Sequence, residues 1–260
     1  MCELLGMSAN TPTDIRFSFS ELMQRGGLVG VHCDGWGITF YDGKAERTFK
    51  EPDPCSHSLF AKLVSTYPLR SKSIVAHIRQ ANSGGLRLEN THPFTRHLWR
   101  KSWTYAHNGQ LANHKKALPI SDIMPVGTTD SEWAFCYLME QLQNHYKKQT
   151  PSLVALKYIA RKMRNIAKQG VFNAIMTDGK LTIAYCTTEL HYITRRAPFS
   201  SALLKSLDWE VDFERETSPN DVVTVIATYP LTTNEVWNKM KSNECIVFRE
   251  GEIIFRKIFK

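Results

Sequence analysis

Apolar residues recur along this chain with two different spacings, and the spacing changes twice. In the first half, short runs rich in β-branched and aromatic residues alternate with turn formers, a pattern typical of strands. Two segments between these runs, 19–24 and 58–66, have the spacing of short helices, and Gly26-Gly27 ends the first. Strands are expected over residues 4–8, 37–41, 73–80 and 103–107.

The middle of the chain has helical spacing. A helix begins at Thr129 or Asp130 and runs to about residue 147, with apolar positions every three or four residues. A second helix starts at Pro151 and ends near residue 170. These two helices separate the strands of the first half from those of the last third.

Strands return after the second helix. The turn sequence Asp178-Gly179-Lys180 predicts a hairpin between two of them. The order of strands, two helices and strands predicts two packed sheets with helices outside, folded as one domain over residues 2–260. The later strands are expected over residues 171–177, 181–187, 191–195, 222–227, 245–249 and 253–258.

Composition places the chain among ordinary folded proteins. Its 260 residues are 42% hydrophobic and 22% charged, and 14 Gly and 11 Pro exclude collagen-like and mostly disordered chains. No uncharged apolar run approaches the ~20 residues that a membrane helix needs. The N-terminus carries Glu3 and no basic region, unlike a signal peptide. We therefore expect a soluble, cytoplasmic protein.

The cysteines and histidines have no spacing typical of a metal site. No Cys-x-x-Cys pair occurs, so we expect free thiols, no structural zinc and no disulfide framework. His77 and His107 are expected to be structural residues on inward-facing strands, and no cofactor is expected. The six cysteines are at positions 2, 33, 55, 136, 186 and 245.

The net charge of +8 raises the question of nucleic-acid binding. The basic residues are dispersed among acids, and the dense cluster at 157–168 fits the solvated face of a helix. No helix-turn-helix, RNP or zinc-finger signature is present. We therefore expect no specific nucleic-acid partner and no membrane partner, and a milder role for the charge in attracting anionic small molecules.

The chemistry starts at Cys2, directly after the initiator Met. Removal of Met1 would leave a thiol and a free α-amine on one residue. Their ordinary pKa values are roughly 8.5 and 7.7–8.0, so moving the proton from thiol to amine costs only about 1 kcal/mol. Such a residue can act as nucleophile and general base without a histidine. By itself this signal is weak, because most cysteines are structural.

Four further segments place polar residues at the ends of strands or the start of a helix. Ala76-His77-Ile78-Arg79 ends a strand with an arginine, and His107-Asn108-Gly109 ends another with an amide and a glycine. Thr129-Asp130-Ser131-Glu132 puts an aspartate at a helix start. Asp34-Gly35-Trp36-Gly37-Ile38 leads a tryptophan into a strand.

These motifs, in this order after Cys2, resemble the class II glutamine amidotransferases, which are N-terminal-nucleophile hydrolases. The nearest branch is the stand-alone YafJ-like one, whose relatives are γ-glutamyl hydrolases. The motifs lie within residues 2–132, and the second half has the length to complete the same domain. The resemblance implies a four-layer α-β-β-α sandwich of two mainly antiparallel sheets.

The resemblance also implies a role for each motif. Cys2 would attack the side-chain amide of glutamine to form a thioester and release ammonia, and water would release glutamate. Asn108 and Gly109 would stabilise the oxyanion, Arg79 would hold the α-carboxylate and Asp130 the α-ammonium. Around them, Asn82 would replace a threonine that helps to hold the carboxylate, and Trp36 would line the pocket.

Two departures from the family leave the substrate open. Gln80-Ala81-Asn82-Ser83 replaces the usual continuation after the arginine, and Arg25-Gly26-Gly27 replaces an Arg-Gly-Pro-Asp segment. Both leave room for longer γ-glutamyl substrates, so a γ-glutamyl peptidase is the alternative. A non-catalytic glutamine sensor is a second alternative. Residues 133–260 complete the fold, so a synthase site for ammonia would have to come from a separate subunit.

Overall fold

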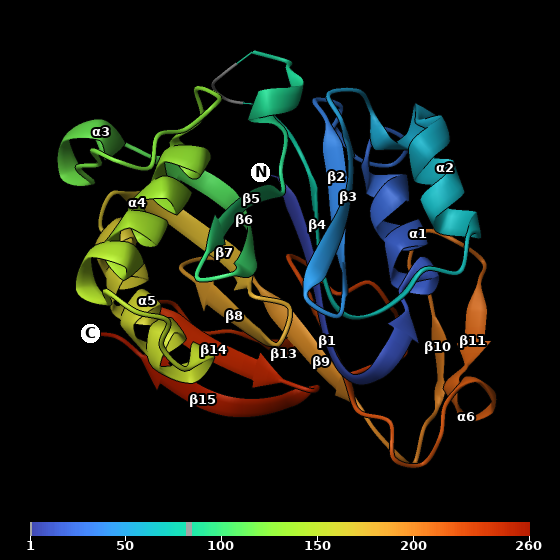
Figure 1. Cartoon of the computed structure of the whole chain (residues 1–260). Helices are drawn as coiled ribbons and strands as arrows, with labels where there is room; N and C mark the ends of the chain where they lie inside the picture. Colours follow the sequence, from blue (N-terminus) through green and yellow to red (C-terminus); the bar gives the residue numbers. More distant parts are fainter. Residues whose placement is uncertain (1, 82–84) are drawn as a thin grey trace.

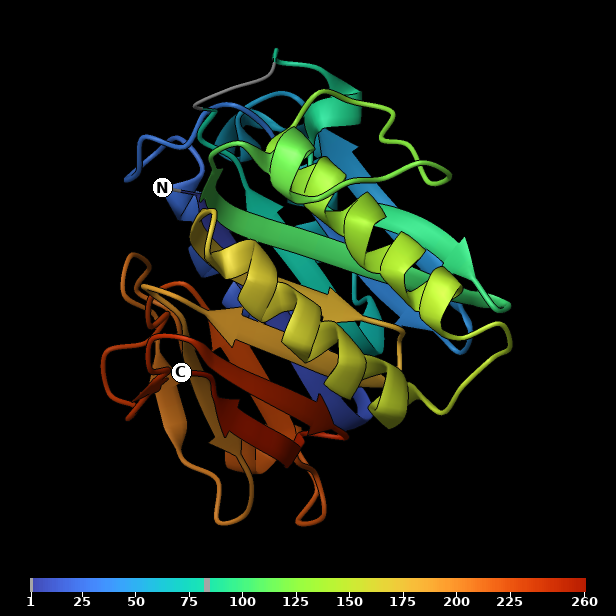
Figure 2. The same cartoon turned by 90° about the vertical axis from the view of Figure 1, so that its left-hand side faces the viewer.

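Two antiparallel sheets pack face to face, and helices cover the outer face of each, so that the molecule has four layers (Figure 1). The computed structural model describes residues 2–81 and 85–260. Turned by 90°, the structure shows the two longer helices lying across one sheet (Figure 2). The layers are therefore helix, sheet, sheet, helix.

The first sheet has seven strands, and its centre contains the strand that begins the chain. Strand β1 pairs with β12 on one side and with β4 on the other. The order across the sheet is β13 (Asn238–Lys239), β9 (His191–Arg195), β12 (Val223–Ala227), β1 (Glu3–Asp14), β4 (Arg70–Ile78), β2 (Trp36–Asp42) and β3 (Ala45–Glu51).

The second sheet has six strands, with β7 paired to β6 on one side and to β8 on the other. The order across it is β15 (Glu252–Ile258), β14 (Glu244–Arg249), β8 (Leu181–Cys186), β7 (Gly170–Thr177), β6 (Lys101–Leu111) and β5 (Phe94–Leu98). A separate short hairpin, β10 (Ser201–Leu203) with β11 (Glu210–Asp212), lies beside the first sheet.

Helices α1 (Arg16–Arg25) and α2 (Leu59–Thr66) cover the first sheet, and α4 (Asp130–His145) and α5 (Ser152–Ala167) cover the second. Thr129 caps α4, since its Oγ1 accepts the Glu132 N–H at 3.2 Å. The remaining short elements are α3 (His114–Ala117), α6 (Phe213–Glu216) and the 3₁₀ turns η1 (Cys55–His57) and η2 (Leu88–Asn90).

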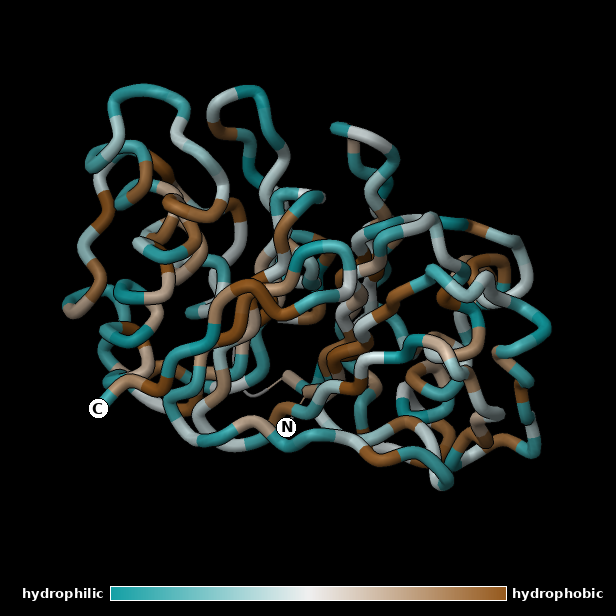
Figure 3. The backbone as a smooth tube through the Cα atoms, turned by 90° about the horizontal axis from the view of Figure 1, so that it is seen from below, coloured by the Kyte–Doolittle hydropathy of each residue, from teal (hydrophilic) through white to brown (hydrophobic). Residues whose placement is uncertain are grey.

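Alternation along the strands divides most of the core into three parts, and a smaller cluster of Phe17, Ala202 and Leu204 lies apart from them. On β1, Leu5 packs with α1 and α2, whereas the neighbouring Leu4 packs between the sheets. Leu4 meets Ile175 of the second sheet in this middle cluster, and a third cluster fills the space beneath α4 and α5. Figure 3 shows the resulting separation, with brown apolar stretches inside and teal polar stretches in the outer loops.

The structure confirms the four-layer fold and the elements predicted from the sequence, with changes at their ends. The largest change is in β1, which was predicted to end at residue 8 and ends at Asp14. Pro151 is the N-cap of α5 and not its first residue, and α5 ends at Ala167. The sequence pattern missed β3 and β5, which are edge strands, and also the short strands β10, β11 and β13 and the short helices α3 and α6. Edge strands face water and carry charged residues, so they lack a clear apolar period. Within the described part of the chain, no helix is long and apolar enough to cross a membrane.

Candidate active site

Cys2 directly precedes β1 and is half-buried beside the end of β4. The register pairs Glu3 with Ile78, so the next residues of β4 reach the cysteine. The Gln80 backbone N–H points at the Cys2 Sγ, with 3.2 Å between nitrogen and sulfur, and the thiol lies 3.4 Å from the Gln80 carbonyl oxygen. The backbone therefore holds the sulfur from two sides.

The surroundings of the thiol favour its protonated form. Burial raises the pKa of Cys2, and the Gln80 N–H and the charge of Arg79 only partly offset this effect. A nucleophilic thiol in this place therefore needs a base to take its proton. Met1 lies outside the described residues, so its removal and the role of the Cys2 α-amine stay predictions.

Asn108 of β6 faces the same cysteine from the other sheet. Its Nδ2 donates to the Cys2 carbonyl oxygen at 2.5 Å, and its side chain is buried. Its Oδ1 is buried without a hydrogen-bond partner among the described residues. Asn173 on β7 supports the strand here by donating from Nδ2 to the Asn108 carbonyl oxygen at 3.3 Å. The side-chain amide of Asn108 is therefore held against the backbone of Cys2.

Gly109 follows at a point where the backbone admits no side chain. A Cβ on this residue would lie 1.8 Å from the Val171 carbonyl oxygen and 2.7 Å from Nε2 of His107. The close approach of β6 and β7 therefore requires glycine. Strand packing therefore explains why this position is glycine, independently of the role that the motif implies.

Arg79 is buried beside Cys2 and is held through its backbone and side chain. Its N–H donates to the Gly35 carbonyl oxygen at 2.8 Å, and its own carbonyl oxygen accepts the Asp34 N–H at 3.1 Å. Its Nη1 lies 3.2 Å from the Gly85 carbonyl oxygen. Burial lowers the pKa of Arg79, while the proximity of Cys2 and Asp34 raises it. A guanidinium is thus fixed near the sulfur.

Asp130, the first residue of α4, is also buried and lies at the end of β6. Its Oδ2 accepts the Leu111 N–H at 2.7 Å, and its Oδ1 accepts the Ser131 N–H at 2.9 Å. Leu111 lies three residues beyond Asn108 on β6, so the strand carries both side chains to one end of the sheet. Asp130 therefore joins β6 to α4 and keeps acceptor capacity for another donor.

The two remaining residues predicted for the site are Asn82 and Trp36. Asn82 lies outside the described residues. Trp36 is fully buried in the core, where its ring packs against Phe19 at 5.9 Å and its Nε1 donates to Glu51 at 3.2 Å. This corrects the prediction that Trp36 lines a pocket. Since Trp36, Ile38 and Phe40 alternate on the face toward α1, the ring points away from the strand ends.

Sequence reasoning missed a buried ion network behind the cysteine. Arg25 places Nη1 3.3 Å from Glu3 and Nη2 3.3 Å from Glu21, and all three side chains are largely buried. Burial raises the pKa of Glu3, and the Arg25 charge opposes this. The sequence signal that could have revealed the network is the acid Glu3, which directly precedes the apolar pair Leu4 and Leu5 at the start of a strand. The network fixes the residue that follows Cys2.

The histidines near the site are buried and packed. His77 stacks on His92 with 4.1 Å between ring centroids, and His107 lies 2.8 Å from Ser131 through Nδ1. Burial lowers the pKa of His77 to about 3, so its ring is neutral. Among the described residues, no group of three or more His, Cys, Asp and Glu side chains has the arrangement of a metal site.

A four-layer α-β-β-α fold with a cysteine at the start of a central strand is that of the N-terminal-nucleophile hydrolases. A family model for the class II glutamine amidotransferases matches residues 1–258. The chain therefore belongs to the class II glutamine amidotransferases, and its relatives place it in their YafJ-like branch.

The chain is similar to the following three proteins, among others. YafJ of Escherichia coli (strain K12), provisionally named a glutamine amidotransferase, is 57% identical over 253 residues, 97% of this chain and 99% of that protein. The crystal structure of a predicted glutamine amidotransferase from Pseudomonas aeruginosa PA01 is 43% identical, with a TM-score of 0.78 over 98% of this chain and 100% of that one. The γ-glutamyl-hercynylcysteine sulfoxide hydrolase of Mycobacterium tuberculosis (strain H37Rv) is 34% identical over 93 residues, 35% of this chain and 37% of that protein.

Proposed function

We propose that this protein hydrolyses the side-chain amide of glutamine through Cys2, releasing ammonia and glutamate. The observation that carries the proposal is the contact between Asn108 and Cys2, in which an amide donor of one sheet reaches the cysteine of the other. Membership of the class II glutamine amidotransferases supports the same reaction.

The proposed reaction has two halves. The Cys2 thiol gives its proton to the α-amine left by removal of Met1, and its sulfur attacks the amide carbon. As the oxyanion collapses, the protonated α-amine passes this proton to the amide nitrogen, so that ammonia leaves and a thioester remains. Water then attacks the thioester and releases glutamate and the thiol. Asn108 Nδ2 and the Gly109 N–H stabilise both oxyanions, and loss of one such donor typically costs roughly 2.7–4 kcal/mol of barrier.

The substrate's head group needs two charges of opposite sign. The buried Arg79 guanidinium is suited to the α-carboxylate, which it can bind with two parallel hydrogen bonds. Asp130 is suited to the α-ammonium, because each carboxylate oxygen that accepts a backbone N–H has a second lone pair. The proposal also gives Asn82, which lies outside the described residues, a role in binding the carboxylate.

The experiment follows glutamate release by untagged protein from which Met1 has been removed. Cys2→Ala should abolish turnover and keep the melting temperature, because the cysteine is half-buried and alanine fits its place. Cys33→Ala is the matched control, since Cys33 is an exposed thiol in the neighbouring loop, and it should keep full activity. Unchanged turnover in Cys2→Ala would contradict the nucleophile role.

A second candidate substrate class is the γ-glutamyl amides. It is favoured by the 93-residue match to a γ-glutamyl-hercynylcysteine sulfoxide hydrolase. Comparing glutamine with glutathione in the same assay separates the two classes. Turnover of glutathione alone would identify a γ-glutamyl peptidase, whereas turnover of glutamine points to a glutaminase.

Membership of the class II glutamine amidotransferases suggests that the ammonia is used by a synthase. We propose that a separate synthase subunit binds the ammonia acceptor, and that a reducing cytoplasmic setting keeps Cys2 a thiol. No turnover of either substrate, with Cys2 unlabelled by a glutamine-analogue electrophile, would favour a non-catalytic glutamine sensor.

A further inference from the structure

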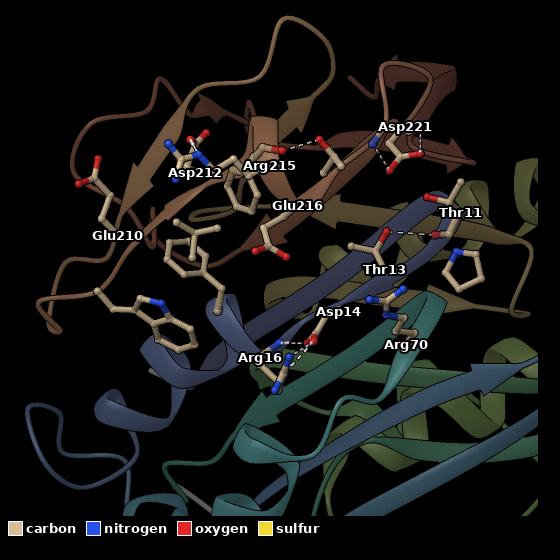
Figure 4. Close-up of a pocket in the computed structure, with 17 residues that line it drawn as sticks. Thr11, Thr13, Asp14, Arg16, Arg70, Glu210, Asp212, Arg215, Glu216 and Asp221 are labelled. Atoms are coloured by element: carbon tan, nitrogen blue, oxygen red, sulfur yellow. Dashed lines mark hydrogen bonds and ion pairs between the residues drawn. The ribbon is translucent and has the colours of Figure 1, made fainter.

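A cavity lies at the far end of the first sheet from Cys2. It holds about 750 Å³ between the segment 209–221 and the ends of β1 and β4 (Figure 4). Strand β1 joins the two places, since Cys2 precedes its first residue and Asp14 is its last. A strand of 12 residues rises roughly 35–40 Å along its path, so this cavity is distinct from the candidate active site.

One wall of the cavity is aromatic. The ring of Phe17 meets the edges of Trp209 and Phe213, with 5.6 Å between centroids in both cases. Trp209 lies on the turn between β10 and β11 and keeps 39% of its surface exposed. The rings therefore offer an apolar surface to whatever enters the cavity.

Some of the charges around the cavity are already paired. Asp14 lies 2.6 Å from Arg16, and Asp212 lies 3.1 Å from Arg215. The pKa of Arg16 is raised chiefly by its hydrogen bond with Asp14, and the charge of Glu216 adds to this effect. Glu216, the last residue of α6, also lines the cavity.

Three charged side chains of the lining, Arg70, Glu210 and Glu216, have no hydrogen bond or ion pair within the described part of the chain. Glu210 is directed away from the other two in Figure 4, whereas Glu216 is close enough to Arg16 for their charges to interact. Figure 4 shows the Glu216 carboxylate and the Arg70 guanidinium on opposite walls, both directed toward the space between them. Both lining residues are exposed, so water now solvates their charges.

We propose that this cavity is a second binding site, for a free α-amino acid with an aromatic side chain. The ligand's carboxylate binds Arg70, its ammonium binds Glu216 and its ring packs on the wall formed by Phe17, Trp209 and Phe213. A ligand with one charge would form an ion pair with only one of these two side chains, and an apolar ligand with neither. The volume suits such a molecule.

The experiment measures binding of L-phenylalanine to the full-length protein by calorimetry. Saturable binding is expected, with 3-phenylpropionate and 2-phenylethylamine at least tenfold weaker because each lacks one charge. Arg70→Met and Glu216→Gln should each weaken binding of phenylalanine at least tenfold. Lys72→Met is the matched control, because it removes the same charge two residues along β4 outside this cavity, and it should bind as the wild type does.

The candidate active site also carries a predicted amino-acid site, so the two must be separated. Binding of phenylalanine should persist in Asp130→Asn and in Cys2→Ala, whatever their effect on glutamine turnover. It should also change tryptophan fluorescence in the wild type and not in Trp209→Phe. Binding lost in Asp130→Asn but kept in Arg70→Met would overturn the proposal, as would equal binding of all three probes or no saturable binding.

Discussion

The chemistry proposed here depends on a few residues whose contacts are set by burial. Cys2 has the Gln80 N–H at its sulfur and the Asn108 amide at its carbonyl oxygen. Burial raises the pKa of its thiol, so the geometry supplies donors but leaves activation of the sulfur to a base. The proposed function gives Arg79 and Asn108 separate roles, the first in binding the substrate and the second in lowering the activation barrier.

Substitutions should show that separation in steady-state kinetics with glutamine. Asn108→Ala should lower kcat roughly 100–1,000-fold with little change in KM, because an oxyanion donor acts in the transition state. Arg79→Lys should raise KM at least tenfold with a smaller change in kcat, because an ammonium cannot reproduce bidentate binding of a carboxylate.

The exposed Arg87 provides the control for the second variant, and Arg87→Lys should leave both constants unchanged. The opposite pattern, with kcat reduced in Arg79→Lys and KM raised in Asn108→Ala, would show that the two roles have been exchanged.

At the scale of elements, helix α4 organises the loop that leads to Asp130. Glu140 is buried and accepts the backbone N–H groups of Ser121, Asp122 and Ile123 at 2.9–3.2 Å. One turn of helix after the cap, Glu132 accepts the Gly127 N–H at 2.7 Å. The helix thus satisfies the backbone of residues 121–127, which have no regular structure of their own.

Glu140→Gln tests this anchoring by its dependence on pH. Burial raises the pKa of Glu140, but the backbone hydrogen bonds outweigh it, and the pKa is lowered overall. A lowered pKa means that the carboxylate stabilises the fold above its unfolded pKa, about 4.3, and loses this effect as the pH falls through its folded value.

Wild type should therefore be more stable than Glu140→Gln by about 1–3 kcal/mol at pH 7 in urea unfolding, with the difference shrinking below about pH 4. Glu210→Gln, at an exposed position, should show no such difference. If the difference in unfolding free energy did not depend on pH, the charge of the carboxylate would not be what holds the loop.

At the scale of the whole molecule, polar contacts between the sheets keep them in register. The Tyr41 hydroxyl of the first sheet donates to the Ser102 carbonyl oxygen at 2.9 Å and lies 2.8 Å from Thr104 of the second. Nearby, the hydroxyls of Ser73 and Thr177 are 2.9 Å apart. These groups are buried, so each needs its partner across the interface.

Removing one of these contacts should destabilise the whole domain and leave the site intact. Tyr41→Phe should lower the free energy of unfolding by about 1–3 kcal/mol, since it leaves buried acceptors without their donor. Urea unfolding measures this, and Tyr67→Phe, at an exposed tyrosine, should change it little. Equal stability of the Tyr41 variant would mean that apolar packing alone joins the sheets.

The sequence by itself determined the kinds of element and most of the proposed chemistry. Strands such as β1 and β4 and helices α4 and α5 have local apolar periods, and those periods depend only on neighbouring residues. The motifs at Cys2, Arg79, Asn108 and Asp130 can also be recognised from the residue types and their order alone. Membership of the family could therefore be inferred before any coordinates.

The tertiary structure decided which of these residues meet. Cys2 lies 106 residues from Asn108 and 78 from Gln80, and only strand pairing and sheet packing close those distances. The burial of Trp36 follows from the face of β2 that α1 covers, and the network of Arg25 from the end of α1 meeting β1. Local periodicity contains no information on such pairings, because they depend on the register of distant strands.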